Sequence, residues 1–154
     1  MDINPITNVE VFKKSLWVTE YAHRMKKWFD GKKIPPLRID AEPHWRCNLN
    51  CIICARRASP VDLTEKSSRM EVSEERWLEI ARESGEMGVR AWNISGIAEP
   101  MCNPQLTLNL MKTIKAYCMF GEITTNGTLW DKNFIGKVVD MEWDNVCISI
   151  DTPE

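Results

Sequence analysis

The sequence predicts an α/β protein built on a parallel sheet. From about residue 37 onward, segments of strand character alternate with segments of helical periodicity, which is the pattern of consecutive βα units. The segments rich in cysteine, glycine or polar residues all follow expected strands. Because ligands bind at the carboxyl ends of the strands in such folds, this placement predicts one site on one rim of the sheet.

Composition and charge exclude several classes of function. The chain has 154 residues, 44% of them hydrophobic, and a net charge of −2, which suits one domain with a real core. No basic patch, signal peptide or long apolar run is present in the sequence, so we expect a cytoplasmic protein without nucleic-acid or membrane partners. Its six cysteines then favour metal or redox chemistry over disulfides.

The first expected element is an amphipathic helix over residues 7–30. Its apolar stripe recurs at helical spacing and consists of Val9, Phe12, Leu16, Ala22, Met25 and Phe29. Gly31 fits the C-cap, and the Pro35-Pro36 pair prevents continuation. We therefore treat residues 1–36 as an N-terminal helical extension.

Four strands and three further helices are expected after this extension. The expected strands are residues 37–41, 89–95, 122–125 and 145–150. The expected helices are residues 73–87, 104–118 and 130–139, with a long loop over 55–72. Ser73 is a favourable N-cap, Gly88 ends its helix, and Pro104 suits a first helical turn.

The strongest chemical feature is the trio Cys47, Cys51 and Cys54, which follows the first strand with spacing C-x3-C-x2-C. Thiolates are soft ligands suited to iron–sulfur clusters, zinc or copper(I). A cubane cluster normally takes four cysteine ligands. A compact set of three therefore predicts a cluster with one iron left open for a small molecule.

Two other kinds of site fit the same residues. His44 lies three residues before Cys47, so His44 and the three cysteines can form a closed zinc site of the Cys3His type that stabilises a binding module. Alternatively, Cys51 and Cys54 can form a thiol–disulfide pair of an oxidoreductase. The cysteines by themselves leave these alternatives open.

Four motifs together resemble the radical S-adenosylmethionine (radical SAM) superfamily. The cysteine segment 47–54 matches the family's C-x3-C-x2-C, including an Asn-Leu after the first cysteine. Residues 95–101 (SGIAEPM) look like its GGEP-type motif, 125–129 (TNGTL) like its TNG turn, and 148–151 (ISID) like the serine-bearing end of its fourth strand. Their order and spacing carry the resemblance.

The resemblance implies a fold and a chemistry. The fold is a partial (βα) barrel of the radical SAM type, truncated here to about four βα units, with residues 37–154 as a core domain incomplete at its C-terminus. The cofactors are a [4Fe–4S] cluster and SAM, which is cleaved reductively to a 5′-deoxyadenosyl radical that abstracts a hydrogen atom from the substrate. The implied partners are a one-electron donor such as a flavodoxin or ferredoxin and an unidentified small molecule or peptide. We expect the truncated chain by itself to turn over poorly.

The resemblance also implies roles for individual residues. Cys47, Cys51 and Cys54 are implied ligands of the cluster, and Glu99 is implied to accept a hydrogen bond from the SAM amino group. The other implied SAM contacts are Gly96 and Ala98, where backbone approaches the methionine moiety, and Thr124 and Ser149, which match positions that bind the carboxylate and ribose. Ala98 departs from the family's glycine, so a positive φ there would be strained.

The remaining candidate residues have weaker roles. Cys102 lies near the rim, whereas Cys118 and Cys147 are expected to be small core residues. Arg56 and Arg57 suit a carboxylate of the substrate or of SAM, or a solvated surface.

Overall fold

The computed structural model describes residues 18–55 and 72–150. The chain divides into two compact units, Met1–Leu37 and Arg38–Glu154, which we describe separately. Arg56 and Arg57, most of the expected loop 55–72 and the first part of the expected helix 7–30 lie outside the described residues.

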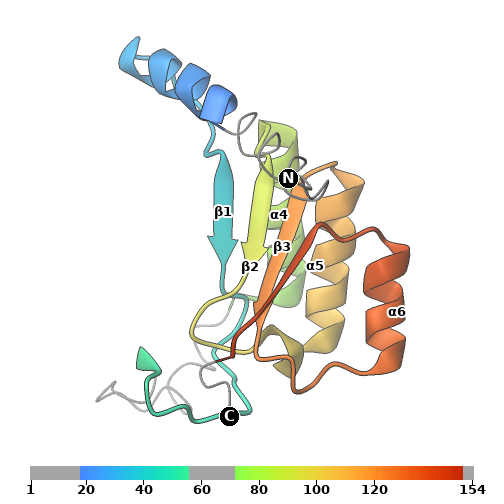
Figure 1. Ribbon diagram of the computed structural model, residues 1–154. Helices are drawn as coiled ribbons and strands as arrows, with labels where there is room; N and C mark the ends of the chain where they lie inside the picture. The colour runs from blue at the N-terminus through green and yellow to red at the C-terminus, as the bar shows by residue number, and fades with distance from the viewer. Residues whose placement is uncertain (1–17, 56–71, 151–154) are drawn as a thin grey trace, which may run out of the picture. The chain divides into compact units, whose positions relative to one another are not determined.

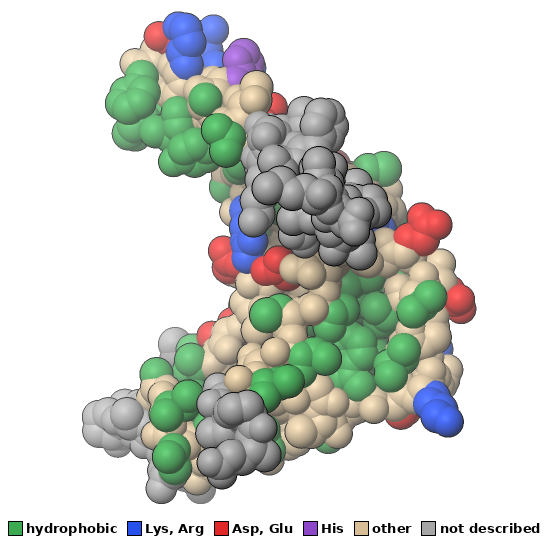
Figure 2. Space-filling model, in the orientation of Figure 1, with side chains coloured by type: hydrophobic (Ala, Val, Ile, Leu, Met, Phe, Trp, Pro, Cys, Tyr) green, Lys and Arg blue, Asp and Glu red, His purple; other side chains and the backbone are tan. Residues whose placement is uncertain are grey.

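The N-terminal unit contains a helix over residues 18–29, as predicted for this stretch. Gly31 follows it with φ of 76°, which suits the end of a helix. The Arg24 guanidinium donates hydrogen bonds to Glu20 and to the carbonyls of Pro35 and Pro36. Hydrophobic side chains gather on one side of this helix (Figure 2), and the exposed ones are Val18, Tyr21, Trp28 and Phe29.

The second unit is built on a four-stranded parallel sheet (Figure 1). Its strands are β1 (Arg38–Ala41), β2 (Ala91–Ile94), β3 (Phe120–Thr125) and β4 (Asn145–Ile148). They lie side by side in chain order, and every neighbouring pair is parallel. The predicted α/β class with a parallel sheet is therefore confirmed.

Helices connect the strands and cover one face of the sheet (Figure 1). They are α4 (Glu74–Met87), α5 (Pro104–Ala116) and α6 (Lys132–Asp140), and a short 3₁₀ helix, η2 (Pro100–Cys102), precedes α5. No helix in the described ranges is long and apolar enough to cross a bilayer.

Local capping explains where these helices begin and end. Ser73 accepts a hydrogen bond from the Arg76 amide at the start of α4, and Gly88 ends it with φ of 89°. Asn103 and Asp131 cap α5 and α6 in the same way. Each cap satisfies a backbone N–H that has no partner inside its helix, so these short polar side chains define the element boundaries.

The core lies between the sheet and the helices. Its fully buried side chains include Trp92, Ile94, Leu110, Met111, Ile114 and Ile123. The Trp92 indole N–H donates to the Ser84 hydroxyl at 2.9 Å, so the largest core residue leaves no polar atom unsatisfied. This packing holds the strand ends in place beneath the site.

Two predictions of burial are wrong. Cys147 is exposed because β4 pairs only with β3 among the described strands and all four of its residues are exposed. Cys118 is exposed as well, in the turn after α5 with φ of 53°. Alternation identifies which strand residues share a face, but it does not say whether that face is covered.

Candidate functional site

The eight residues predicted to bind metal or cofactor line one cavity at the carboxyl ends of the strands. The cavity has a volume of about 250 Å³. The eight are Cys47, Cys51, Cys54, Gly96, Ala98, Glu99, Thr124 and Ser149. They come from four segments that follow or end β1, β2, β3 and β4, so the parallel sheet brings together residues that are far apart in the sequence.

The three thiols belong to one loop without regular secondary structure. Cys47, Cys51 and Cys54 are each partly exposed and form no disulfide. The Cys54 amide donates to the Cys51 carbonyl at 3.1 Å, and the Leu49 amide to the Cys47 sulfur at 3.5 Å. In the described residues, no three His, Cys, Asp or Glu side chains are grouped closely enough to bind a single metal ion.

His44 is engaged in the fold and does not line the cavity. Its ring is 3% exposed, and Nδ1 accepts a hydrogen bond from the Arg46 amide at 3.2 Å. That bond places the ring proton on Nε2, which lies 3.4 Å from the Pro100 carbonyl oxygen. A zinc site through His44 would have to break one of these contacts, so the structure does not favour that alternative.

Glu99 connects three segments of the rim. Its carboxylate is 2% exposed and accepts hydrogen bonds from the Thr125 hydroxyl at 2.6 Å, the Asn126 amide at 2.7 Å and the Met101 amide at 3.1 Å. Its own amide donates to the Arg46 carbonyl at 2.9 Å. A carboxylate offers about four acceptor positions. Three are used within the fold, which leaves one for a ligand in the cavity.

The loop of Gly96 and Ala98 is shaped by Glu42, a residue that the sequence analysis did not identify. Gly96 has φ of 122°, and a Cβ there would overlap the Glu42 carboxyl group. The same carboxylate accepts a hydrogen bond from the Ala98 amide at 3.0 Å. Ala98 has no positive φ, so the strain considered for it does not arise. A polar residue directly after a strand was the available clue to Glu42.

Replacement of Gly96 by alanine is expected to destabilise the protein by about 1–3 kcal/mol. The physical reason is the positive φ together with the overlap with Glu42. Chemical denaturation of the two proteins measures this difference. The matched control is Gly136→Ala in α6, where a Cβ meets nothing within 4 Å and alanine favours the helix. An equal stability of the two variants would contradict the expectation.

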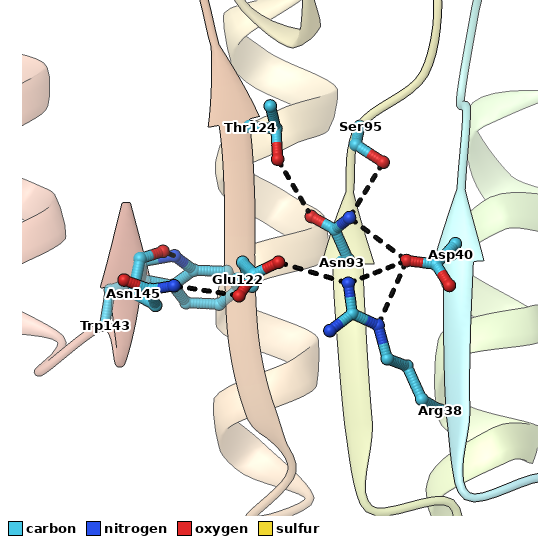
Figure 3. Close-up of polar contacts among 8 residues, drawn as sticks. All are labelled: Arg38, Asp40, Asn93, Ser95, Glu122, Thr124, Trp143 and Asn145. Carbon is cyan, nitrogen blue, oxygen red and sulfur yellow. Dashed lines mark hydrogen bonds and ion pairs between the residues drawn. The ribbon is translucent and has the colours of Figure 1, made fainter. Parts of the chain in front are cut away.

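A polar array crosses the strands of the sheet (Figure 3), and its member Thr124 lines the cavity. Asp40, Asn93, Glu122 and Asn145 occupy one row across the four strands. The Arg38 guanidinium donates to Asp40 and to Glu122. Its hydrogen bond to Asp40 holds the pKa of that carboxyl below its usual value, so Asp40 stays ionised at neutral pH.

Asn93 links this array to the cavity. Its side-chain amide donates to Asp40 at 3.0 Å and to the Ser95 hydroxyl at 2.9 Å. Its carbonyl oxygen accepts from the Thr124 hydroxyl at 3.4 Å, and Thr124 lines the cavity. The orientation of Thr124 therefore depends on residues of β1 and β2.

Cys102 lies at the end of η2, and its thiol interacts electrostatically with Cys47 and Glu99. Burial raises the pKa of its thiol, and these electrostatic interactions with the neighbouring Cys47 and Glu99 side chains raise it further. The Cys102 thiol is therefore neutral at physiological pH. It does not line the cavity.

The donor set and the cavity fit an iron–sulfur cluster better than one metal ion. A single zinc ion requires each sulfur at about 2.3 Å from one point, whereas the described thiols do not gather in this way. A cubane cluster is larger than a single metal ion, and its cysteine ligands bind separate irons, so their sulfur atoms lie farther apart. Three soft donors line a cavity of about 250 Å³ together with a carboxylate and hydroxyls, a donor set that suits a cluster with a ligand on its open iron.

Comparison with known proteins identifies relatives by sequence. The family model described as "Radical SAM superfamily" matches residues 43–154. A PqqA peptide cyclase of Granulibacter bethesdensis is 30% identical over 115 residues, 75% of this chain and 29% of that protein. A probable GTP 3',8-cyclase of Archaeoglobus fulgidus is 34% identical over 127 residues, 79% of this chain and 37% of that protein. The chain thus spans about a third of the length of these relatives.

Solved structures with the same fold include SuiB of Streptococcus suis bound to S-adenosylmethionine. It superposes with a TM-score of 0.61 at 20% identity, covering 99% of this chain and 30% of SuiB. BtrN in complex with AdoMet and 2-DOIA superposes with a TM-score of 0.56 at 16% identity, covering 76% of this chain and 46% of BtrN. At these identities the structural likeness concerns the fold.

Proposed function

This chain belongs to the radical SAM superfamily, and from that membership we propose that it forms part of an enzyme that cleaves SAM reductively and abstracts a hydrogen atom from its substrate. The family uses SAM and an iron–sulfur cluster. The observation that carries the proposal is the convergence of the three thiols with Glu99, Thr124 and Ser149 on one cavity.

Each wall of the cavity has a role in this proposal. Cys47, Cys51 and Cys54 would hold three irons of a [4Fe–4S] cluster, which supplies, when bound, the electron that breaks the C5′–S bond of SAM. Glu99 would accept a hydrogen bond from the SAM amino group with its remaining acceptor position. Thr124 and Ser149 would contact the carboxylate and ribose of SAM, and the backbone at Gly96 and Ala98 would lie against the methionine moiety.

The proposal extends to partners but leaves the substrate open. A one-electron donor such as a flavodoxin or ferredoxin would reduce the cluster in the cytoplasm, where thiolates stay reduced. One relative is named for a peptide and the other for GTP, so both a peptide and a small molecule are candidate substrates. The polar array beside Thr124 offers charged and amide groups to either of them (Figure 3).

The proposed chemistry predicts that the anaerobically reconstituted and reduced protein converts SAM to 5′-deoxyadenosine and methionine. Liquid chromatography of both products measures this, with unreduced protein and a Cys51→Ser variant as controls. A reconstituted protein that binds iron and sulfide but neither binds SAM nor cleaves it would overturn the proposal.

A further inference from the structure

We infer that Asn48 is a positioning residue that holds the cysteine loop in the geometry needed to retain the cluster; this inference rests on the proposed function. Asn48 lies between the first two cysteines, and its side chain is exposed. Asn48 does not itself line the cavity. Its hydrogen bonds run instead to the turn after β3, about 80 residues away in the sequence.

Three side chains form a closed ring of hydrogen bonds. The side-chain NH₂ group of Asn48 donates to the Thr128 hydroxyl at 2.8 Å. That hydroxyl donates to the side-chain oxygen Oδ1 of Asn126 at 2.7 Å. The side-chain NH₂ group of Asn126 then donates to the side-chain oxygen Oδ1 of Asn48 at 3.0 Å. Each residue donates once and accepts once within the ring. Such cyclic networks strengthen cooperatively, so the loss of one member weakens the remaining bonds.

The orientation of both amides follows from the surrounding backbone. The Thr128 backbone amide donates to the side-chain oxygen Oδ1 of Asn126 at 2.9 Å. Because that oxygen faces Thr128, the NH₂ group of the Asn126 side chain points toward Asn48. The carbonyl oxygen of Asn48 must therefore face Asn126, and its NH₂ group must face Thr128. No exchange of oxygen and nitrogen in either amide satisfies all four bonds.

The ring is anchored on the buried side of the rim. The Asn126 backbone amide donates to the Glu99 carboxylate at 2.7 Å, and the Glu99 amide donates to the Arg46 carbonyl just before the first cysteine. The cysteine loop is therefore held at two points, the backbone of Arg46 and the side chain of Asn48. Because Arg46 and Asn48 flank Cys47, these contacts hold Cys47 in a constant position on the rim, which a rigid cluster requires.

Substitution of Asn48 by alanine is expected to raise the rate of cluster loss to an iron chelator by about 3- to 10-fold, the effect of losing two exposed side-chain hydrogen bonds. Anaerobic decay of the cluster's visible absorption measures this rate. Thr128→Val should raise the rate similarly, and the double variant Asn48→Ala/Thr128→Val should be no faster than the faster single variant, because both changes open the same ring.

The matched control is Asn50→Ala, a change of the same type at an exposed residue of the same loop. The melting temperature of the cluster-free Asn48→Ala protein should equal that of the wild type, since the ring is exposed. The inference is overturned if Asn48→Ala and Asn50→Ala release the cluster at equal rates, if the double variant is additive, or if the cluster-free protein melts earlier. A wild-type protein that takes up no iron would instead overturn the proposed function itself.

Discussion

Replacement of any one of Cys47, Cys51 and Cys54 by serine is expected to lower the iron content from about four atoms per chain to nearly none. A hydroxyl is a poor ligand for iron in a sulfide cluster, and two remaining thiols cannot hold a cubane whose fourth iron is already open. Iron and sulfide analysis of protein purified without oxygen measures this. The absorption of the wild-type cluster should bleach on reduction and be absent from all three variants.

Cys118→Ser and Cys147→Ser are the matched controls, because both thiols are exposed and lie outside the cavity. The three variants also separate the alternative functions. A thiol oxidoreductase needs Cys51 and Cys54 but not Cys47, so full activity of the Cys47 variant in a disulfide assay would contradict the cluster. One zinc per chain in a colourless wild-type protein would contradict it as well.

Replacement of Glu99 by alanine is expected to destabilise the cluster-free protein by about 3–5 kcal/mol. The change removes the acceptor for the Thr125 hydroxyl and for the amides of Asn126 and Met101. Two of these bonds are buried and the Asn126 bond is partly buried. Each donor loses a bond to a carboxylate, which is stronger than a bond to a neutral group. Urea denaturation of the cluster-free variant measures the loss.

The control for Glu99 is Glu75→Ala, an exposed glutamate on α4 whose loss should change stability by about 0.5 kcal/mol or less. Glu99→Gln tests the proposed SAM contact separately. The glutamine side chain keeps one acceptor oxygen but presents an NH₂ group either to the Asn126 amide or to the Thr125 and Met101 donors. We therefore expect Glu99→Gln to lose less stability than Glu99→Ala and to bind SAM more weakly than the wild type. A Glu99→Ala protein as stable as the Glu75→Ala control would show that these bonds do not hold the rim together.

The order of helices and strands could be predicted from the sequence because caps and periodicity act over a few neighbouring residues. Ser73 and Gly88 bound α4 as expected, and Pro104 starts α5. The strands were predicted less closely: β2 (Ala91–Ile94) is shorter than expected and β3 begins at Phe120. The ends of a strand depend on the neighbouring strand, and the Phe120 amide pairs with the Arg90 carbonyl, a contact between segments that are far apart in the chain.

The interpretation of single residues was less reliable. The sequence suggested that Gly96 serves a ligand, whereas the structure shows that it first accommodates Glu42. The exposure of Cys118 and Cys147 was not predicted either. In both cases the missing information is which side chain or surface lies opposite the residue.

The sequence by itself determined the α/β class, the helix boundaries and the segments that carry the chemistry, because capping, periodicity and motif spacing act over a few residues. The tertiary structure decided which of these segments touch. Glu99 meets Thr125, and Asn48 meets Asn126 across 78 residues of sequence, while Asn93 reaches Thr124 across β2 and β3. These contacts depend on strand register and on packing against the shared core, and no local pattern in the sequence records either of them.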